Sequence, residues 1–387
     1  MRVLITGGAG YIGSTIASAC LDAGIDPVIL DSLVTGRREF AEGRVFYEGD
    51  ISDGPLIDKI FAECPDISAV IHCAALIVVP DSVADPIGYY RANVAKSLDF
   101  VEHLLRNGCT RMIFSSSASI YQAGDDHTVT EESPLAPQSP YARTKAVCEG
   151  MFADIAAGRP IRILSLRYFN PVGADPLMRT GLQLRRPSHA LGKMIEAYEE
   201  GVPFQITGTG YPTADGTGIR DYIHVWDLAE AHVAALRRFD SLEADVINLG
   251  TGSGTTVREL VEAFNRVADR PIEAVEAPRP PRRRGRRLHP QRPRPRAARL
   301  ADPLLLGGRH QTLTPMGCPP PHPPPLTRKG RRGREAGPKH RPGSDRAGAL
   351  TRGVSRRGCR SGVRGWRCRP RRSRTSWSPG RRAEPSP

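Results

Sequence analysis

The stretch TGGAGYIG, residues 6–13, most constrains what this chain can fold into. It follows an apolar run at residues 3–5 and opens an amphipathic run at residues 11–23, which together predict a strand, a tight turn and a helix. Glycine suits such a turn because a side chain would block its backbone angles, and bare glycine lets a pyrophosphate approach the amides at the helix N-terminus. A glycine turn without a ligand is the alternative interpretation.

An acidic residue at the expected position favours nucleotide binding over a glycine turn without a ligand. Asp31 ends the second apolar run, residues 27–30, and stands eighteen residues after Gly13. A carboxylate there can hydrogen-bond both hydroxyls of an adenosine ribose and repels a 2′-phosphate. The sequence therefore predicts a βαβ unit that binds NAD in preference to NADP.

Apolar and amphipathic runs alternate through residues 1–168. Strands are expected at 45–47, 69–75, 111–114 and 161–166, and helices at 53–64, 87–105 and 141–157. This rhythm is typical of a parallel sheet covered on both faces. We predict an α/β fold with a Rossmann-type, doubly wound parallel sheet over 1–168.

The pattern changes after residue 168, where the loops lengthen. Helices at 189–200, 227–238 and 256–268 alternate with short strands at 204–206 and 245–249, and a further strand is expected near 272–275. We predict a smaller, incomplete substrate-binding lobe over 169–277, built partly from segments that rejoin the sheet.

The last 110 residues differ from the rest in composition. Residues 278–387 hold 31 of the 55 lysine and arginine residues against four acids, a charge of +27, whereas residues 1–277 carry −13. Twenty of the 35 prolines are here and apolar periodicity is lost, so we predict a disordered tail. The high pI belongs to this tail alone.

Two origins for the tail stay open. A basic arm that binds nucleic acid through phosphate contacts is one. The other, which we favour, is a shifted reading frame, because Arg, Pro, Gly and Ala have G- and C-rich codons and the change falls inside a lobe. Nucleic acid is therefore expected as a partner only if the tail is genuine.

Other features place the chain among cytoplasmic proteins. The cysteines show no paired or metal-ligand spacing, so we expect buried thiols and no metal site. The N-terminus leads directly into the first strand and no apolar run approaches bilayer length, so no signal peptide or membrane span is expected.

A tyrosine and a lysine stand one helical turn apart in the run YARTK. Tyr141 and Lys145 would share a helix face, where the ammonium stabilises a phenolate and lowers the tyrosine pKa. Such a tyrosine can take a proton from a hydroxyl while a nicotinamide takes the hydride. Ser117, at the end of the strand before this helix, can hold the substrate oxygen. A purely structural pair is the alternative.

Longer motifs carry a resemblance to a known family. They are GDISD (49–53), HCAAL (72–76), FSSSASIYQ (114–122), SPYARTK (139–145), LRYFNPVGADP (166–176) and DGTGIRDYIHVWDLAEAH (215–232). Over residues 1 to about 277 the chain resembles the extended short-chain dehydrogenase/reductases of the NAD-dependent epimerase/dehydratase family, and among them the UDP-glucose 4-epimerases.

The resemblance implies a set of site residues. The catalytic residues would be Tyr141, Lys145 and Ser117. The cofactor-binding residues would be Gly7, Gly10, Tyr11, Ile12, Gly13, Asp31, Asp50, Ile51, Ala74, Asn93, Tyr141, Lys145 and Tyr168. The substrate-binding residues would be Ser117, Tyr141, Asn170 and Arg220.

It also implies an activity. The enzyme would interconvert UDP-galactose and UDP-glucose, in galactose metabolism, through a 4-keto intermediate formed with tightly held NAD, and it would be a homodimer. The family's late diphosphate-binding arginine would fall near residues 282–286, where its pattern is lost, and a lysine of several members is replaced by Ile77. Whether this product is active, and which UDP-sugar it prefers, stays open.

Two rival functions stay open as well. One is another sugar-nucleotide epimerase or dehydratase, although Ala118 and Ser119 stand where 4,6-dehydratases carry an acid pair. The other is a non-catalytic dinucleotide-binding protein whose basic arm engages nucleic acid. Salt-dependent DNA binding that disappears on deleting 278–387 would support it.

Overall fold

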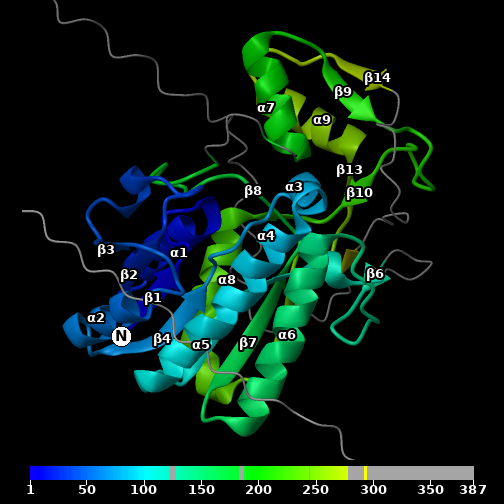
Figure 1. The fold of residues 1–387 in the computed structure, drawn as a ribbon. Helices are drawn as coiled ribbons and strands as arrows, with labels where there is room; N and C mark the ends of the chain where they lie inside the picture. Colours follow the sequence, from blue (N-terminus) through cyan, green and yellow to red (C-terminus); the bar gives the residue numbers. More distant parts are fainter. Residues whose placement is uncertain (123–127, 183–186, 188, 244, 278–291, 294–387) are drawn as a thin grey trace, which may run out of the picture. The chain divides into compact units, whose positions relative to one another are not determined.

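The computed structural model describes residues 1–122, 128–182, 187, 189–243, 245–277 and 292–293 (Figure 1). All of them belong to one compact unit, Met1–Pro321. Apart from β15 (Arg292–Pro293), which pairs with β6 (Thr128–Val129), the tail predicted over 278–387 lies outside the described residues.

A seven-stranded parallel sheet forms the centre of the fold. From one edge to the other its strands are β3 (Val45–Glu48), β2 (Asp26–Asp31), β1 (Arg2–Thr6), β4 (Ile67–His72), β5 (Arg111–Ser117), β7 (Arg162–Tyr168) and β12 (Val246–Leu249). The strand order reverses between β1 and β4, and in open α/β sheets the carboxyl ends at such a switch point bind ligands. The predicted Rossmann-type sheet is confirmed.

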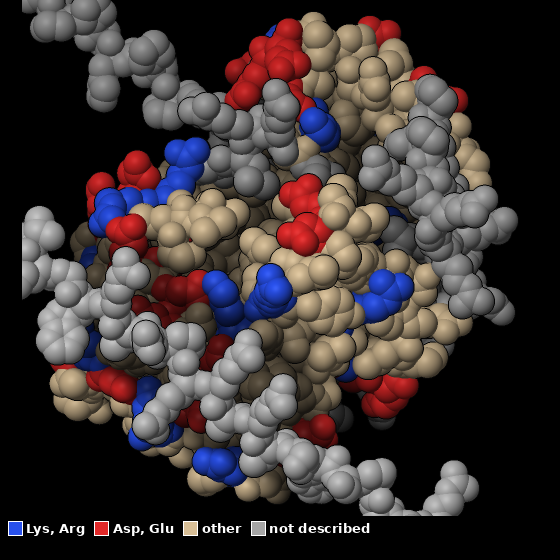
Figure 2. All heavy atoms as spheres, viewed as in Figure 1, with Lys and Arg blue, Asp and Glu red and all other residues tan. Residues whose placement is uncertain are grey.

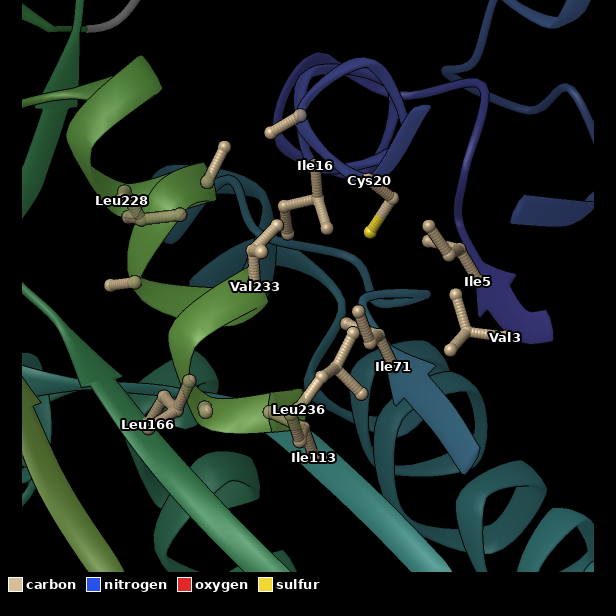
Figure 3. Packing of buried hydrophobic residues seen from close by; sticks show 14 of the residues in the cluster. Val3, Ile5, Ile16, Cys20, Ile71, Ile113, Leu166, Leu228, Val233 and Leu236 are labelled. Carbon is tan, nitrogen blue, oxygen red and sulfur yellow. The ribbon is translucent and has the colours of Figure 1, made fainter. Parts of the chain in front are cut away.

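Helices cover both faces of this sheet (Figure 1). One face packs against α2 (Gly54–Glu63), α5 (Lys96–Arg106) and α6 (Pro140–Gly158), and the other against α1 (Tyr11–Asp22) and α8 (Val225–Arg238). Strand side chains alternate between the faces, so Val3 and Ile5 lie in one cluster and Leu4 in the other. Figure 3 shows Ile16 of α1 and Val233 of α8 packed over the face that carries Val3 and Ile5.

The helix expected over 87–105 is interrupted. It consists of α4 (Pro86–Tyr90), a π-helical turn at Arg91–Ala95 and α5, and the short helix α3 (Val79–Ala84) precedes it. Such π turns are frequent at functional sites. The turn contains Asn93, one of the predicted cofactor residues.

The segment after residue 168 divides between the sheet and a small lobe. The helix α8 and strand β12 rejoin the central sheet, as expected. The lobe contains α7 (Ala190–Glu200), β9 (Phe204–Thr207), α9 (Val257–Val267) and β14 (Ala274–Ala277), around a cluster that includes Met194 and Phe264. Two short pairs complete this segment: β8 (Asn170–Val172) with β11 (Tyr222–His224), and β10 (Ile219–Arg220) with β13 (Thr255–Thr256).

Candidate active site

The glycine turn at the switch point is tightly packed against neighbouring backbone. Gly7 has a φ of +67°, and its amide donates to the Leu30 carbonyl at 2.8 Å. A Cβ on Gly7 would lie 2.8 Å from the Ala74 amide nitrogen, and one on Gly13 only 2.3 Å from the Gly7 carbonyl oxygen. The turn therefore brings Gly7, Gly13 and Ala74, three of the residues predicted to bind the cofactor, close together.

The helix that follows presents its first amides without a side-chain cap. Gly10 is the N-cap of α1 and makes no side-chain hydrogen bond, and Tyr11 and Ile12 begin the helix. Free amides and the helix dipole favour a negative group here. The Tyr11 hydroxyl donates to the Gly173 carbonyl at 2.8 Å and so ties the helix to the loop after β8. This end of α1 fits a pyrophosphate.

Asp31 is held by the same turn. Its carboxylate accepts from the Ala9 amide at 3.0 Å and from the Leu33 amide at 2.8 Å, and the residue is only 7% exposed. Burial raises the Asp31 pKa, while the two amide bonds oppose that rise. A buried carboxylate at the end of β2 fits the predicted ribose contact.

Other predicted cofactor residues are engaged by the protein itself. Asp50 pairs with Lys96 and accepts from the Ser52 amide at 3.0 Å, and Ile51 is buried in the core. The Asn93 amide group exchanges two hydrogen bonds with the backbone of residue 76, at 2.8 and 2.9 Å, and donates to Thr144 at 3.1 Å. Asn93 thus joins the chain after β4 to helix α6.

Tyr141 and Lys145 lie at the start of α6. Ser139 caps this helix by accepting from the Ala142 amide at 3.1 Å, and Pro140 occupies the first turn. Both residues therefore project from a well-fixed helix end. Tyr141 keeps partial solvent exposure, whereas Lys145 is 3% exposed.

The electrostatics of this pair differ from the expectation. Burial raises the Tyr141 pKa to about 12, and contact with the Ser117 hydroxyl lowers it. The Lys145 ammonium donates to the Ser115 carbonyl at 2.7 Å and lies 4.7 Å from the centre of the Phe114 ring. The predicted lowering of the tyrosine pKa by Lys145 is therefore absent in the protein alone, because the ammonium is directed at a backbone carbonyl and desolvation dominates.

The three serines that end β5 have different partners. The Ser115 hydroxyl lies 2.7 Å from the Tyr168 hydroxyl, and Ser116 donates to Glu149 of α6. The Ser117 oxygen accepts from the Ser119 amide at 3.2 Å and contacts Tyr141. Ser117, Tyr141 and Tyr168 are thus brought together at the carboxyl edge of the sheet.

The predicted substrate residues Asn170 and Arg220 form a second group. The Asn170 side chain donates to the Asp221 carbonyl at 3.0 Å, and the Arg220 guanidinium donates to the Ile219 carbonyl at 2.7 Å. Asp221 is fully buried and accepts from the Gly252 amide at 2.8 Å. These contacts fix the paired segments β8 and β11.

Sequence reasoning missed a buried ion pair beneath Tyr141 and Lys145. Glu149 of α6 accepts from the Arg167 guanidinium of β7, and the two side chains are 8% and 6% exposed. The available signal was spacing, since Glu149 follows Lys145 by one helical turn. The pair joins the helix of the candidate site to the sheet.

Two kinds of feature are missing from the described part of the chain. None of its helices has both the length and the apolar character needed to cross a membrane. Its His, Cys, Asp and Glu residues form no group of three or more that could hold a metal ion.

Together, the sheet, the glycine turn and the Ser117–Tyr141–Lys145 group define an NAD-dependent enzyme of the Rossmann class. The chain belongs to the NAD-dependent epimerase/dehydratase family, which it matches over residues 3–250. This confirms the family and the cofactor predicted from the sequence.

Individual relatives agree with this assignment. The chain is 42% identical over 283 residues to a UDP-glucose 4-epimerase from Azospirillum brasilense, covering 72% of this chain and 81% of the relative. It is 40% identical over 294 residues to the Bacillus subtilis UDP-glucose 4-epimerase, covering 73% and 86%.

Solved structures of such epimerases are also similar. One from Stenotrophomonas maltophila, with bound NAD and formylated UDP-arabinopyranose, has a TM-score of 0.71 at 35% identity and covers 78% of this chain and 91% of its own. One from Bifidobacterium longum, in complex with NAD⁺ and UDP, has a TM-score of 0.70 at 33% identity, with the same coverage. The predicted enzyme class is confirmed.

Proposed function

We propose that this chain is a 4-epimerase that interconverts UDP-galactose and UDP-glucose. The single observation that carries the proposal is the contact between Ser117 and Tyr141 at the carboxyl edge of the sheet, next to Lys145 and the glycine turn. A solved UDP-N-acetylglucosamine 4-epimerase from Methanobrevibacter ruminantium also has a similar structure, so the sugar is the part that the assay below must decide.

The residues around the switch point fit the cofactor. Gly7 and Gly13 permit the tight packing of the turn, and Gly10 leaves the start of α1, where a pyrophosphate would bind, without a side-chain cap. Asp31 offers a buried carboxylate to the adenosine ribose. Tyr11, Ile12, Ala74 and Tyr168 would line the same cleft, with Lys145 on the nicotinamide ribose. Asp50 and Ile51 would flank the adenine, and Asn93 supports the cleft through its contacts with the chain after β4.

The acid–base work belongs to Tyr141. Bound NAD would supply a reversible hydride acceptor and a positive charge beside the phenol. That charge would favour the phenolate over the neutral phenol, an effect that the Lys145 ammonium does not supply in the protein alone. Tyr141 then takes the proton of the sugar's 4-hydroxyl and later returns it, while Ser117 holds the reacting oxygen. Asn170 and Arg220 would hold the diphosphate.

Three finer points complete the proposal. We place the domain boundaries at 168/169 and 277/278.

We propose a homodimer formed through α4, α5 and α6, which expose Ile87, Leu98 and Val147. Uncharged surface predominates over α4 and α6 in Figure 2. We also place the protein in the cytoplasm, because Cys20, Cys64, Cys73, Cys109 and Cys148 are free thiols.

A labelled-substrate assay tests the proposal. UDP-galactose carrying deuterium at carbon 4 is incubated with the purified chain, and the products are separated and analysed by mass spectrometry. UDP-glucose that keeps the label is expected, because the hydride leaves and returns without exchange with water. Loss of the label to solvent, or a chain that neither carries nor takes up NAD, would contradict it. A 1–277 chain serves to test whether residues 278–387 are needed.

A further inference from the structure

Tyr168, at the carboxyl end of β7, holds its hydroxyl between two buried polar groups. The Tyr168 oxygen lies 2.7 Å from the Ser115 hydroxyl and 2.6 Å from Nε2 of His232 on α8. Tyr168 is 6% exposed and His232 is not exposed at all. Water therefore cannot replace these hydrogen bonds, and the donor of each must be one of the buried side chains themselves.

A backbone carbonyl decides which atoms carry the protons. Nδ1 of His232 lies 2.8 Å from the Leu228 carbonyl oxygen one turn earlier in α8. A carbonyl only accepts, so Nδ1 must carry the hydrogen. Burial lowers the His232 pKa to about 4, so the ring is neutral at pH 7 and its Nε2 is a bare acceptor. The short contact with Tyr168 then requires the phenol to donate.

Further hydrogen bonds connect Tyr168 to the catalytic lysine. Because Tyr168 gives its proton to His232, the short contact with Ser115 requires the serine hydroxyl to donate to the Tyr168 oxygen. The Ser115 oxygen also lies 3.1 Å from the Cys73 sulfur, and because the serine has only one hydroxyl hydrogen, the Cys73 thiol must be the donor in that contact. The carbonyl of Ser115 accepts from the Lys145 ammonium at 2.7 Å. The hydrogen bonds thus run in one direction from Ser115 through Tyr168 to α8, and Lys145 is anchored on the backbone of Ser115.

We propose that His232 is a positioning residue, which keeps Tyr168 a neutral hydrogen-bond donor and so fixes its ring and Ser115 at the edge of the sheet. This rests on the role proposed for Tyr141, because the consequence is that proton exchange with the sugar stays on Tyr141. Tyr168 and Tyr141 are close enough to influence each other electrostatically, and burial raises the Tyr168 pKa well above its usual value. A second phenol held neutral does not compete as the base.

The tautomer of His232 can be measured directly, whether or not the chain turns over. The protein is labelled with ¹⁵N-histidine, and the His232 ring signals are those missing from the His232→Gln spectrum. We expect a neutral ring protonated on Nδ1 from about pH 6 to 8, against a free histidine that titrates near 6.5. A ring protonated on Nε2, or a charged ring, overturns the proposal.

Kinetics then separate positioning from simple packing. His232→Leu removes the acceptor and should lower kcat about tenfold, with KM for UDP-galactose and NAD content nearly unchanged. His232→Gln offers an acceptor oxygen and should restore most of the rate. Val233→Ala, also on α8 and 7% exposed, is the control for lost packing and should keep kcat.

The outcomes against the proposal are distinct from those against the proposed function. Unchanged kcat per folded, NAD-loaded His232→Leu protein overturns it, as does a His232→Gln variant no faster than His232→Leu. The losses of kcat in Tyr168→Phe and His232→Leu should be less than additive in the double variant, because each single variant removes the hydrogen bond between Tyr168 and His232. If wild-type protein converts no UDP-sugar, the proposed function fails, and the ring spectrum still decides the role of His232.

Discussion

The Arg167 guanidinium and the Glu149 carboxylate form a buried two-pronged ion pair between β7 and α6. The Arg167 Nε lies 2.9 Å from one carboxylate oxygen and 3.2 Å from the other, and Ser116 also donates to the carboxylate. A terminal nitrogen of Arg167 donates to the Tyr121 hydroxyl at 2.6 Å, and Tyr121 donates to Asn248 at 2.8 Å. This network anchors α6, and hence Tyr141 and Lys145, to the strands β5, β7 and β12 of the sheet.

Removing one charge from this pair should be costly. Glu149→Gln leaves the Arg167 charge buried and uncompensated, so we expect a loss of about 3–5 kcal/mol in the free energy of unfolding. Urea denaturation followed by circular dichroism measures it. The exposed pair of Lys59 and Glu63 is the control, because its side chains are 60% and 52% exposed. Lys59→Gln should change stability by less than about 1 kcal/mol, and an equal loss in both variants would show that the buried network carries no special weight.

Two glycine replacements should have opposite effects. A Cβ on Gly13 would lie 2.3 Å from the Gly7 carbonyl oxygen, so Gly13→Ala must displace the turn and should abolish tight NAD binding, with about 1–3 kcal/mol lost from stability. Gly150, within α6, has open space around a Cβ. Gly150→Ala should therefore stabilise the chain by about 0.5–1 kcal/mol. Thermal unfolding and NAD titration measure both effects. Normal NAD binding by Gly13→Ala would refute the proposal that the glycine turn binds the cofactor.

Tyr141→Phe should remove the acid–base group and leave the cofactor in place. We expect kcat to fall about 10²–10⁴-fold, the range typical of a general acid–base residue, with NAD content unchanged. The NAD released from denatured protein is measured beside the UDP-galactose assay. Wild-type turnover by this variant would show that the base is another group.

Ser117→Ala tests the contact that lowers the Tyr141 pKa. Without the serine hydroxyl the phenol is harder to ionise, so the rise of kcat with pH should move to higher pH. At neutral pH we expect about a tenfold loss, the worth of one hydrogen bond to a charged group. A rate profile that keeps its wild-type position on the pH axis would argue that Ser117 only shapes the site.

Local patterns in the sequence were enough to predict the sheet and its ligand-binding edge. The glycine turn, Asp31 and Tyr141 could be identified as candidate site residues because each belongs to a short sequence motif with recognisable spacing. The partners of Ser115 and Ser116 could not be predicted, because they come from β7, α6 and the chain after β4, up to 53 residues apart for Ser115 and Tyr168. The direction of the Tyr141 pKa was also mispredicted, since sequence spacing gives the position of Lys145 but neither its hydrogen-bond acceptor nor the desolvation of the phenol.

Two buried histidines should make stability depend on pH. His72 lies between Thr6 and Ser97, at 2.7 and 2.9 Å, and burial lowers its pKa to about 3, while that of His232 falls to about 4. In the unfolded chain both titrate near 6.5, so between about pH 4 and 6.5 the unfolded state binds more protons than the folded state. Each histidine should then raise the free energy of unfolding by about 1.4 kcal/mol per pH unit over that range, and above about pH 7 this contribution is complete.

Urea denaturation at several pH values between about 5 and 8 tests this dependence. His232→Gln carries one titrating group fewer and should lose the contribution of that imidazole to the slope below about pH 6.5. Val233→Ala lowers stability by removing packing and no titrating group, so its curve should lie below that of the wild type and run parallel to it. A His232→Gln curve parallel to the wild type would mean that His232 takes up its proton over the same pH range in the folded protein as in the unfolded chain. The neutral acceptor that the Tyr168 hydroxyl requires would then be lost below about pH 6.5, where the proposed proton order predicts that it persists.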